Sequence, residues 1–341
     1  MARAIFVEGL NQSGKSTIVY ALCSHLGQIG YYPVLIKLPN YGTLVGDYIL
    51  KRYLPNVKMR PDDLRKSIEA QMILFAANRI EVLTGLRRIL HDLEGEGLSE
   101  KVFVVCDRSP LSSCFTYIDS LLYSDILNID DIHNRDLWGM MRILRRISEA
   151  QQGEELFQLT EEDIPALEVL YTAAIERILH LDRYFLAEFD HIDTVILDIP
   201  VEDVMRVREL AEFTKSLDVQ EEVAIQTIVR RLYLLAGQDP LLKDRMPVSV
   251  LDQMEGGERL MTSVLVDRIL NALSIKQEVL LKAYRGAAEP HFDGAVDFSM
   301  HPDLAGGFFS LMQHSRLAGV RRALDFDTIY KEGLSKGAEI E

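Results

Sequence analysis

Residues 9–17 read Gly-Leu-Asn-Gln-Ser-Gly-Lys-Ser-Thr and complete the pattern GxxxxGK[ST]. A short apolar run at residues 4–8 precedes them, and residues 18–26 follow with a helical pattern. The two glycines allow the backbone to curl so that successive N–H groups face a polyphosphate, and the following helix adds the positive end of its dipole. The pattern places Lys15 at the β and γ phosphates and Ser16 at Mg²⁺. The stretch therefore predicts a strand, a phosphate-binding loop and a helix, in that order.

Composition narrows the class of protein. The chain has 341 residues, 48% of them hydrophobic, which is enough for one large domain or a domain with an appendage. A formal charge of −15 argues against nonspecific binding to nucleic acid or to an anionic membrane. The three cysteines show no CxxC spacing, no apolar stretch reaches membrane-spanning length, and no signal-like segment precedes the first strand. We therefore expect a protein of a reducing, cytoplasmic compartment.

Four further short apolar runs predict buried strands, at residues 34–37, 102–106, 194–198 and 248–252. Helical patterns separate them, so the sequence predicts an α/β fold: a three-layer, open parallel sheet with helices on both faces. Ligands of such sheets bind at the carboxyl ends of the strands. Four polar or glycine positions fall at those ends: Gly9, Lys37, Asp107 and Asp198.

Two segments exceed what this sheet requires. Amphipathic patterns at residues 136–147 and 167–181 predict a helical insertion at about 123–189. From Ser274 the chain starts as a helix and then becomes rich in glycine, histidine and acidic residues. We expect residues 274–341 to form a C-terminal extension, for which the sequence indicates no role.

Two further pairs of residues are candidates for function. In a helix expected to begin near Pro61, Phe75 and Arg79 lie four positions apart and share one face. A ring that stacks on a base and a guanidinium that binds oxygens would suit a nucleotide, although a core residue beside a solvated charge has the same spacing. Asp107-Arg108 follows an apolar strand, where the carboxylate could order Mg²⁺ and its waters or form an ordinary salt bridge.

In combination these residues resemble the thymidylate kinase family of P-loop nucleoside monophosphate kinases. The family opening FxxxEGxxGxGKST is similar to residues 5–17, and its LFxAxR helix is similar to residues 74–79. Other family elements have counterparts at residues 37–39, 43–46, 107–112, 195–200, 217–233 and 248–252. The likeness covers residues 1 to about 122 and about 190 to 273.

The resemblance implies a kinase domain over residues 1–273 with a lid at about 206–218. It implies that MgATP is bound by Gly9, Leu10, Asn11, Gln12, Ser13, Gly14, Lys15, Ser16 and Thr17, with Mg²⁺ held by Ser16 and Asp107. It implies an acceptor site made by Lys37, Pro39, Phe75, Asn78, Arg79, Arg108 and Ser112, in which Phe75 stacks on thymine and Arg79 holds the acceptor phosphate. The expected partners are small-molecule nucleotides, with neither nucleic acid nor membrane, and a homodimer is possible.

Three positions depart from the family pattern. Asn11 replaces an acidic residue, Lys37 replaces an arginine, and Ser109 replaces a tyrosine that walls the sugar pocket. The change at Lys37 turns a fork that binds phosphate bidentately into a point charge.

The loop also lacks an arginine, because Gln12 stands where some family members carry one. The lid is therefore expected to supply the catalytic cation, from Arg206 or Arg208. Side chains two residues apart on a helix point in different directions, so one of the two is expected to reach ATP.

The resemblance implies transfer of the γ-phosphoryl group of MgATP to dTMP, giving dTDP. A deoxynucleoside kinase is a competing interpretation, because Asp107-Arg108-Ser109 is similar to the acid-arginine-serine element of that class, with Glu8 as the nearest candidate base. A kinase for another monophosphate and a nucleotide-binding regulatory protein on the same fold are also consistent with the sequence.

Overall fold

The structure is a computed structural model, and it describes residues 2–53, 64–113, 142–143, 159–210 and 223–273. Most of the predicted helix at 136–147, the greater part of the predicted lid and the C-terminal extension lie outside these residues. Among the described helices, not one combines the length and the apolar character needed to cross a membrane.

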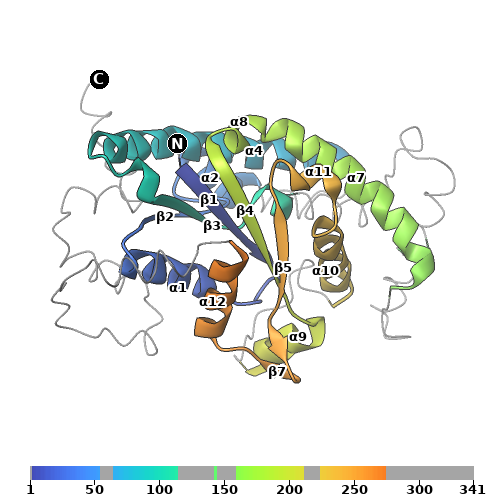
Figure 1. The fold of residues 1–341 in the computed structure, drawn as a ribbon. Helices are drawn as coiled ribbons and strands as arrows, with labels where there is room; N and C mark the ends of the chain where they lie inside the picture. The colour runs from blue at the N-terminus through green and yellow to red at the C-terminus, as the bar shows by residue number, and fades with distance from the viewer. Residues whose placement is uncertain (1, 54–63, 114–141, 144–158, 211–222, 274–341) are drawn as a thin grey trace.

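Five parallel strands form the central sheet in the order β2-β3-β1-β4-β5 (Figure 1). They are β1 (Ala2–Gly9), β2 (Tyr32–Lys37), β3 (Val102–Asp107), β4 (Phe189–Asp198) and β5 (Val248–Asp252). The predicted parallel sheet is confirmed, although β4 begins five residues earlier than the predicted Thr194. The first residues of β4 include the exposed Asp190 and His191, so this part lacks the apolar signal while still pairing with β1.

Helices cover both faces of the sheet, as predicted (Figure 1). On one face, α1 (Lys15–Gln28) and α12 (Thr262–Ala272) pack side by side. The other face is covered by α4 (Leu64–Gly95), α7 (Ile164–Leu181), α8 (Arg183–Leu186) and α10 (Val223–Ala236). The shorter helices are α2 (Leu44–Tyr48), a π-helix (Ile49–Tyr53), two 3₁₀ turns (Ser99–Lys101 and Glu161–Asp163), α9 (Val201–Leu210) and α11 (Pro240–Lys243).

The helix predicted at 167–181 is α7, and it packs into the main core. Leu167, Ala174 and Ile178 are buried in the same cluster as the sheet residue Phe6. Phe6 also stacks on Phe185 of α8, with ring centroids 6.0 Å apart. The second half of the predicted insertion therefore builds the layer above the sheet, while the boundaries of the insertion stay a prediction.

A small hairpin follows β5 and was not predicted. It consists of β6 (Met254–Glu255) and β7 (Glu258–Arg259), and Figure 1 shows it beyond the end of β5. Gly256 and Gly257 form its two-residue turn with φ angles of 61° and 85°. A two-residue turn with positive φ at both positions favours glycine, so the Gly-Gly pair is the sequence signal for this hairpin.

Candidate active site at the phosphate loop

The loop after β1 has the backbone geometry that its glycines allow. Gly9 has φ 147°, and a Cβ there would lie 2.7 Å from the carbonyl oxygen of Leu197 on β4. Gly14 has φ 87° and directly precedes α1. A side chain is strained at such φ values, so the two glycines of the motif stand at two positions where this backbone needs glycine.

Lys15 lies buried beneath the loop. Its Nζ donates to the carbonyl oxygens of Gly9 and Leu10 at 2.9 and 2.5 Å. Burial, reinforced by the nearby positive charge of Arg108, lowers the pKa of Lys15 to about 7. A polyphosphate would oppose this shift, because negative charge favours the ammonium form.

Ser16 and Asp107 meet across the mouth of the loop. The Ser16 Oγ donates to Asp107 Oδ2 at 2.6 Å, because β3 runs parallel to β1 and ends beside it. Together with Lys15 and Arg108, these residues line a cavity of about 250 Å³. Hydroxyl and carboxylate oxygens suit Mg²⁺, which keeps several waters and takes few protein ligands, so the residues present fit this ion. Clusters of three or more potential metal-binding side chains are absent from the described part of the chain.

Glu8, at the end of β1, is the centre of a buried hydrogen-bond network. Its Oε1 accepts from the Ser109 N–H at 2.6 Å, the Ser109 hydroxyl at 2.7 Å and the Ser112 N–H at 3.2 Å. Its Oε2 accepts from the Ser112 hydroxyl at 2.8 Å and from Tyr233 of α10 at 2.9 Å. Burial, followed by the negative charge of Glu8, raises the pKa of Tyr233. The network ties the loop, the segment after β3 and α10 together.

Arg108 reaches the phosphate loop from the end of β3. Its Nη2 donates to Asn11 Oδ1 at 2.7 Å, and its side chain is half-buried. Arg108 has φ 80°, at the turn where the Ser109 N–H bonds to Glu8. Asn11 therefore supplies an oxygen to this guanidinium where the resemblance leads one to expect a carboxylate.

Lys37 lies apart from the loop cavity. It ends β2, is exposed, and places its Nζ 5.3 Å from the ring centroid of Tyr20 on α1.

Asn78 organises the turn after β2. It donates to the Asn40 carbonyl at 3.0 Å and the Thr43 hydroxyl at 2.7 Å, and it accepts from the Asn40 N–H at 2.8 Å. Pro39 directly precedes Asn40, so the predicted acceptor residue Asn78 contacts the residue next to Pro39. The Asn78 amide is fully buried in this role.

Arg79 forms a buried ion pair that the sequence did not reveal. Its Nε and Nη2 donate to the two carboxylate oxygens of Asp182 at 2.5 and 2.8 Å, and Nη1 donates to Ser113 at 2.9 Å. The side chain is 3% exposed, and Phe75, one turn earlier, is buried too. An acceptor phosphate would have to compete with Asp182 for this fork, so the acceptor role of Arg79 stays a prediction.

The lid arginines are only partly described. Arg206 on α9 is 71% exposed and pairs with Asp203 at 3.2 Å. The side chain of Arg208 and residues 211–222 lie outside the description. The catalytic role of either arginine therefore stays a prediction.

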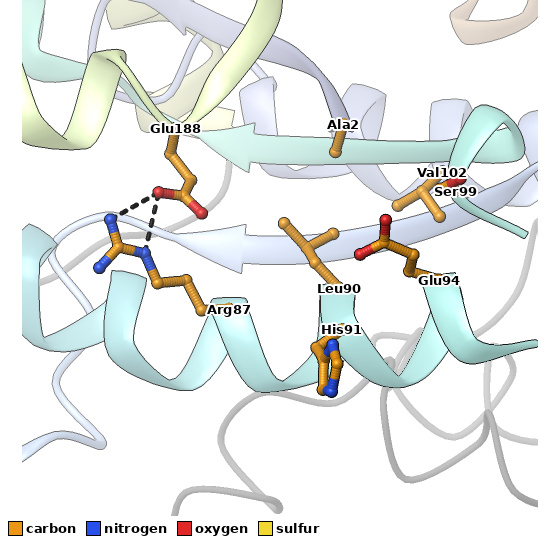
Figure 2. A pocket seen from close by; sticks show the side chains of 8 residues that line it. All are labelled: Ala2, Arg87, Leu90, His91, Glu94, Ser99, Val102 and Glu188. Carbon is orange, nitrogen blue, oxygen red and sulfur yellow. Dashed lines mark hydrogen bonds and ion pairs between the residues drawn. The ribbon is translucent and has the colours of Figure 1, made fainter.

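A second, smaller cavity lies at the opposite ends of the strands. It has a volume of about 180 Å³ and is bordered by Ala2 and Val102, at the starts of β1 and β3. Figure 2 shows Arg87 and Glu188 paired at one side of it.

The parallel sheet and the loop give the chain an α/β fold of the P-loop kinase type. The parallel sheet places the phosphate loop at the carboxyl end of the central strand, between β3 and β4. That is where ligands bind in sheets of this architecture.

Comparison with known proteins narrows this class. Residues 7–121 match the family model described as thymidylate kinase. The chain is also similar to a thymidylate kinase of an Exiguobacterium species, with 30% identity over 139 residues, which is 40% of this chain and 56% of the relative. The matched part thus spans about half the length of that relative. These findings confirm the resemblance to the thymidylate kinase family.

Proposed function

We propose that the chain is a nucleoside monophosphate kinase that transfers the γ-phosphoryl group of MgATP to dTMP, giving dTDP. The observation that carries the proposal is the contact of Ser16 with Asp107 beside Lys15, at one cavity. A metal-binding hydroxyl, a strand-end carboxylate and a phosphate-binding cation are the parts that phosphoryl transfer needs in this class. The family match over residues 7–121 supports the same activity.

On the donor side, the loop would bind the phosphates of ATP with the N–H groups of residues 9–17. Lys15 would leave its carbonyl partners and neutralise the β and γ oxygens. Ser16 and Asp107 would hold Mg²⁺, which, when bound, neutralises charge on the transferring group. The lid arginine, Arg206 or Arg208, would add positive charge at the transition state.

On the acceptor side, Arg108 is the cation best placed near the loop. It is half-buried and reaches Asn11 and Ser112, at 2.7 and 3.5 Å. We propose that it holds the acceptor phosphate, and that Phe75 stacks on the base. Lys37 would have to swing away from Tyr20 to contribute.

One observation weighs against the deoxynucleoside kinase. A sugar hydroxyl needs a base that accepts its proton, yet both Glu8 oxygens accept several hydrogen bonds from Ser109, Ser112 and Tyr233. A phosphate acceptor needs little activation near neutral pH, so this arrangement favours a monophosphate substrate.

We also propose that residues 1–273 form the kinase domain, with the insertion at about 123–189 and the lid at about 206–218. Residues 274–341 would then be an extension. A homodimer stays a prediction. Exposed apolar side chains do occur on α2 and α4, which pack together: Leu44, Tyr48, Ile73 and Ile80.

A substrate panel tests the proposed function. The purified chain would be incubated with MgATP and each of thymidine, dTMP, dUMP, dCMP, dGMP and UMP, with products separated by ion-exchange chromatography. We expect dTDP from dTMP at the highest kcat/KM, with thymidine unchanged and Lys15→Ala inactive. Phosphorylation of thymidine would show the nucleoside kinase instead, and no product from any acceptor would support a regulatory protein on the kinase fold.

A further inference from the structure

An arginine 246 positions after Ser13 lies against the phosphate loop. Arg259 is on β7, and its Nη2 donates to the Ser13 carbonyl at 2.6 Å and to Gln253 Oε1 at 3.2 Å. The same nitrogen would be 2.7 Å from a Cβ placed on Gly14. A side chain at position 14 would therefore displace the end of the Arg259 side chain from this contact.

The hairpin that carries Arg259 is itself held in place. Arg268 of α12 pairs with Glu255 at 3.1 Å, and the Leu260 N–H donates to the Gln253 carbonyl at 2.8 Å. The backbone of Gln253 in turn donates to Asp198 at the end of β4. The backbone bonds of Gln253 hold the hairpin at the carboxyl edge of the sheet, where Arg259 contacts the loop.

The contact with Ser13 determines which way one peptide unit of the loop faces. A trans peptide is planar, with its C=O and the next N–H on opposite sides. Since Arg259 holds the Ser13 oxygen on the hairpin side, the Gly14 N–H faces the other side, toward the cavity that Gly14 and Lys15 line. Inward-facing N–H groups are what make such a loop bind anions.

Two buried polar atoms beside this contact have no hydrogen-bond partner in the described structure. They are Ser13 Oγ and Gln253 Nε2, in side chains that are fully buried. The Ser13 hydroxyl lies inside the loop, 3.0 Å from where a Cβ on Gly9 would be. Unpartnered buried polar groups are costly, and both atoms belong to residues that Arg259 contacts.

We propose that Arg259 is a positioning residue for the donor polyphosphate. It holds the Ser13–Gly14 peptide in the orientation that binds phosphate, and it adds positive charge beside a loop in which Gln12 supplies none. The inference rests on the proposed MgATP donor. It gives the hairpin after β5 a role, which is to hold the Ser13–Gly14 peptide of the phosphate loop in its orientation.

The test measures binding of a polyphosphate that carries no nucleoside, because Arg259 is proposed to act on the phosphate loop and not on the nucleotide base. Magnesium tripolyphosphate and MgADP would be titrated calorimetrically into the full chain and into Arg259→Ala, Arg259→Lys and Arg268→Ala. Arg268→Ala is the matched control, because it removes an arginine whose ion pair with Glu255 is solvent-exposed and leaves the backbone hydrogen bonds of Gln253 that hold the hairpin. A charge-assisted hydrogen bond predicts about tenfold to hundredfold weaker binding of both ligands in Arg259→Ala, with partial recovery in Arg259→Lys.

A second readout is independent of ligand. The Gly14 amide resonance of glycine-labelled protein should shift in Arg259→Ala and stay in place in Arg268→Ala. In steady-state kinetics, the KM for MgATP should rise while the KM for the acceptor is unchanged.

Two results would overturn the positioning role. The first is that Arg259→Ala binds tripolyphosphate as tightly as the unsubstituted chain does. The second is that Arg259→Ala and Arg268→Ala lose the same amount of tripolyphosphate affinity. Binding of tripolyphosphate that depends on Arg259 in a chain that phosphorylates no acceptor would support the positioning role while the proposed kinase activity fails.

Discussion

Breaking the buried ion pair between Arg79 and Asp182 should destabilise the fold. The guanidinium donates to both carboxylate oxygens at 2.5 and 2.8 Å, and the two side chains are 3% and 1% exposed. Removal of one partner leaves an uncompensated charge in the core, which typically costs about 3–5 kcal/mol. We therefore expect Arg79→Met to lower the free energy of unfolding by about 3–5 kcal/mol.

A double-mutant cycle separates the pair from the packing. Asp182→Leu alone should cost about as much as Arg79→Met alone, because each leaves one buried charge. The double variant should regain most of the loss, since neither charge then remains. The measurement is urea unfolding followed by circular dichroism, with the midpoint compared at an unchanged slope.

The chain offers a matched control on the same helix. Arg87 lies two turns beyond Arg79 on α4 and pairs with Glu188 at 2.8 Å, but its side chain is 61% exposed. Solvent screens such a pair, so Arg87→Ala should leave the unfolding midpoint nearly unchanged.

The same variants distinguish the two roles of Arg79. Loss of a charged contact to the acceptor would raise the acceptor KM at least about tenfold. If Arg79→Met did so while remaining as stable as the Arg87→Ala control, the stabilising role of the Arg79–Asp182 pair would be refuted. That result would favour the acceptor role predicted from the LFxAxR resemblance. A large stability loss, recovered in the double variant, would show that Arg79 acts mainly through its ion pair with Asp182.

Three further sets of variants test the phosphate loop, the metal ligand and the lid. Because the pKa of Lys15 falls from 10.5 to about 7 on folding, the unfolded chain binds more protons between these values and stability rises with pH. Lys15→Met should remove about 2–3 kcal/mol of the rise in unfolding free energy between pH 7 and 9, measured by urea titration, and an unchanged pH dependence would contradict this. Asp107→Asn should raise the Mg²⁺ concentration needed for half-maximal activity about tenfold or more, as loss of a charged ligand contact implies, whereas an unaltered magnesium requirement would separate Asp107 from the metal. Of Arg206→Ala and Arg208→Ala, one should lower kcat at least about a hundredfold with little change in dTMP binding, and full kcat in both would place the transition-state cation elsewhere.

Local chemistry explains what could be predicted. The phosphate loop is a contiguous motif, and Gly9 and Gly14 each adopt a positive φ angle that favours glycine. Residues 9–17 could therefore be assigned without knowing the fold. The buried strands could also be recognised, because helices on both faces make them continuously apolar. The start of β4 was missed for the converse reason, since Asp190 and His191 are exposed.

Partners distant in sequence could not be predicted. Asp182 lies 103 positions from Arg79, and Tyr233 lies 225 positions from Glu8. The sequence marks each of these residues as polar, but it does not indicate whether a charge faces a ligand, solvent or another side chain.

The amino-acid sequence by itself determined a phosphate-binding loop between a buried strand and a helix, a parallel sheet and the family resemblance, because these depend on short-range spacing and periodicity. Only the tertiary structure decided that Arg79 faces Asp182, that Glu8 joins three segments and that Arg259 lies against Gly14. The contacts of Glu8 and Arg259 arise where parallel strands end at one edge and bring distant loops together, and that of Arg79 arises where α4 packs against α7 and α8. Both depend on the packed sheet and its helices and not on any one segment.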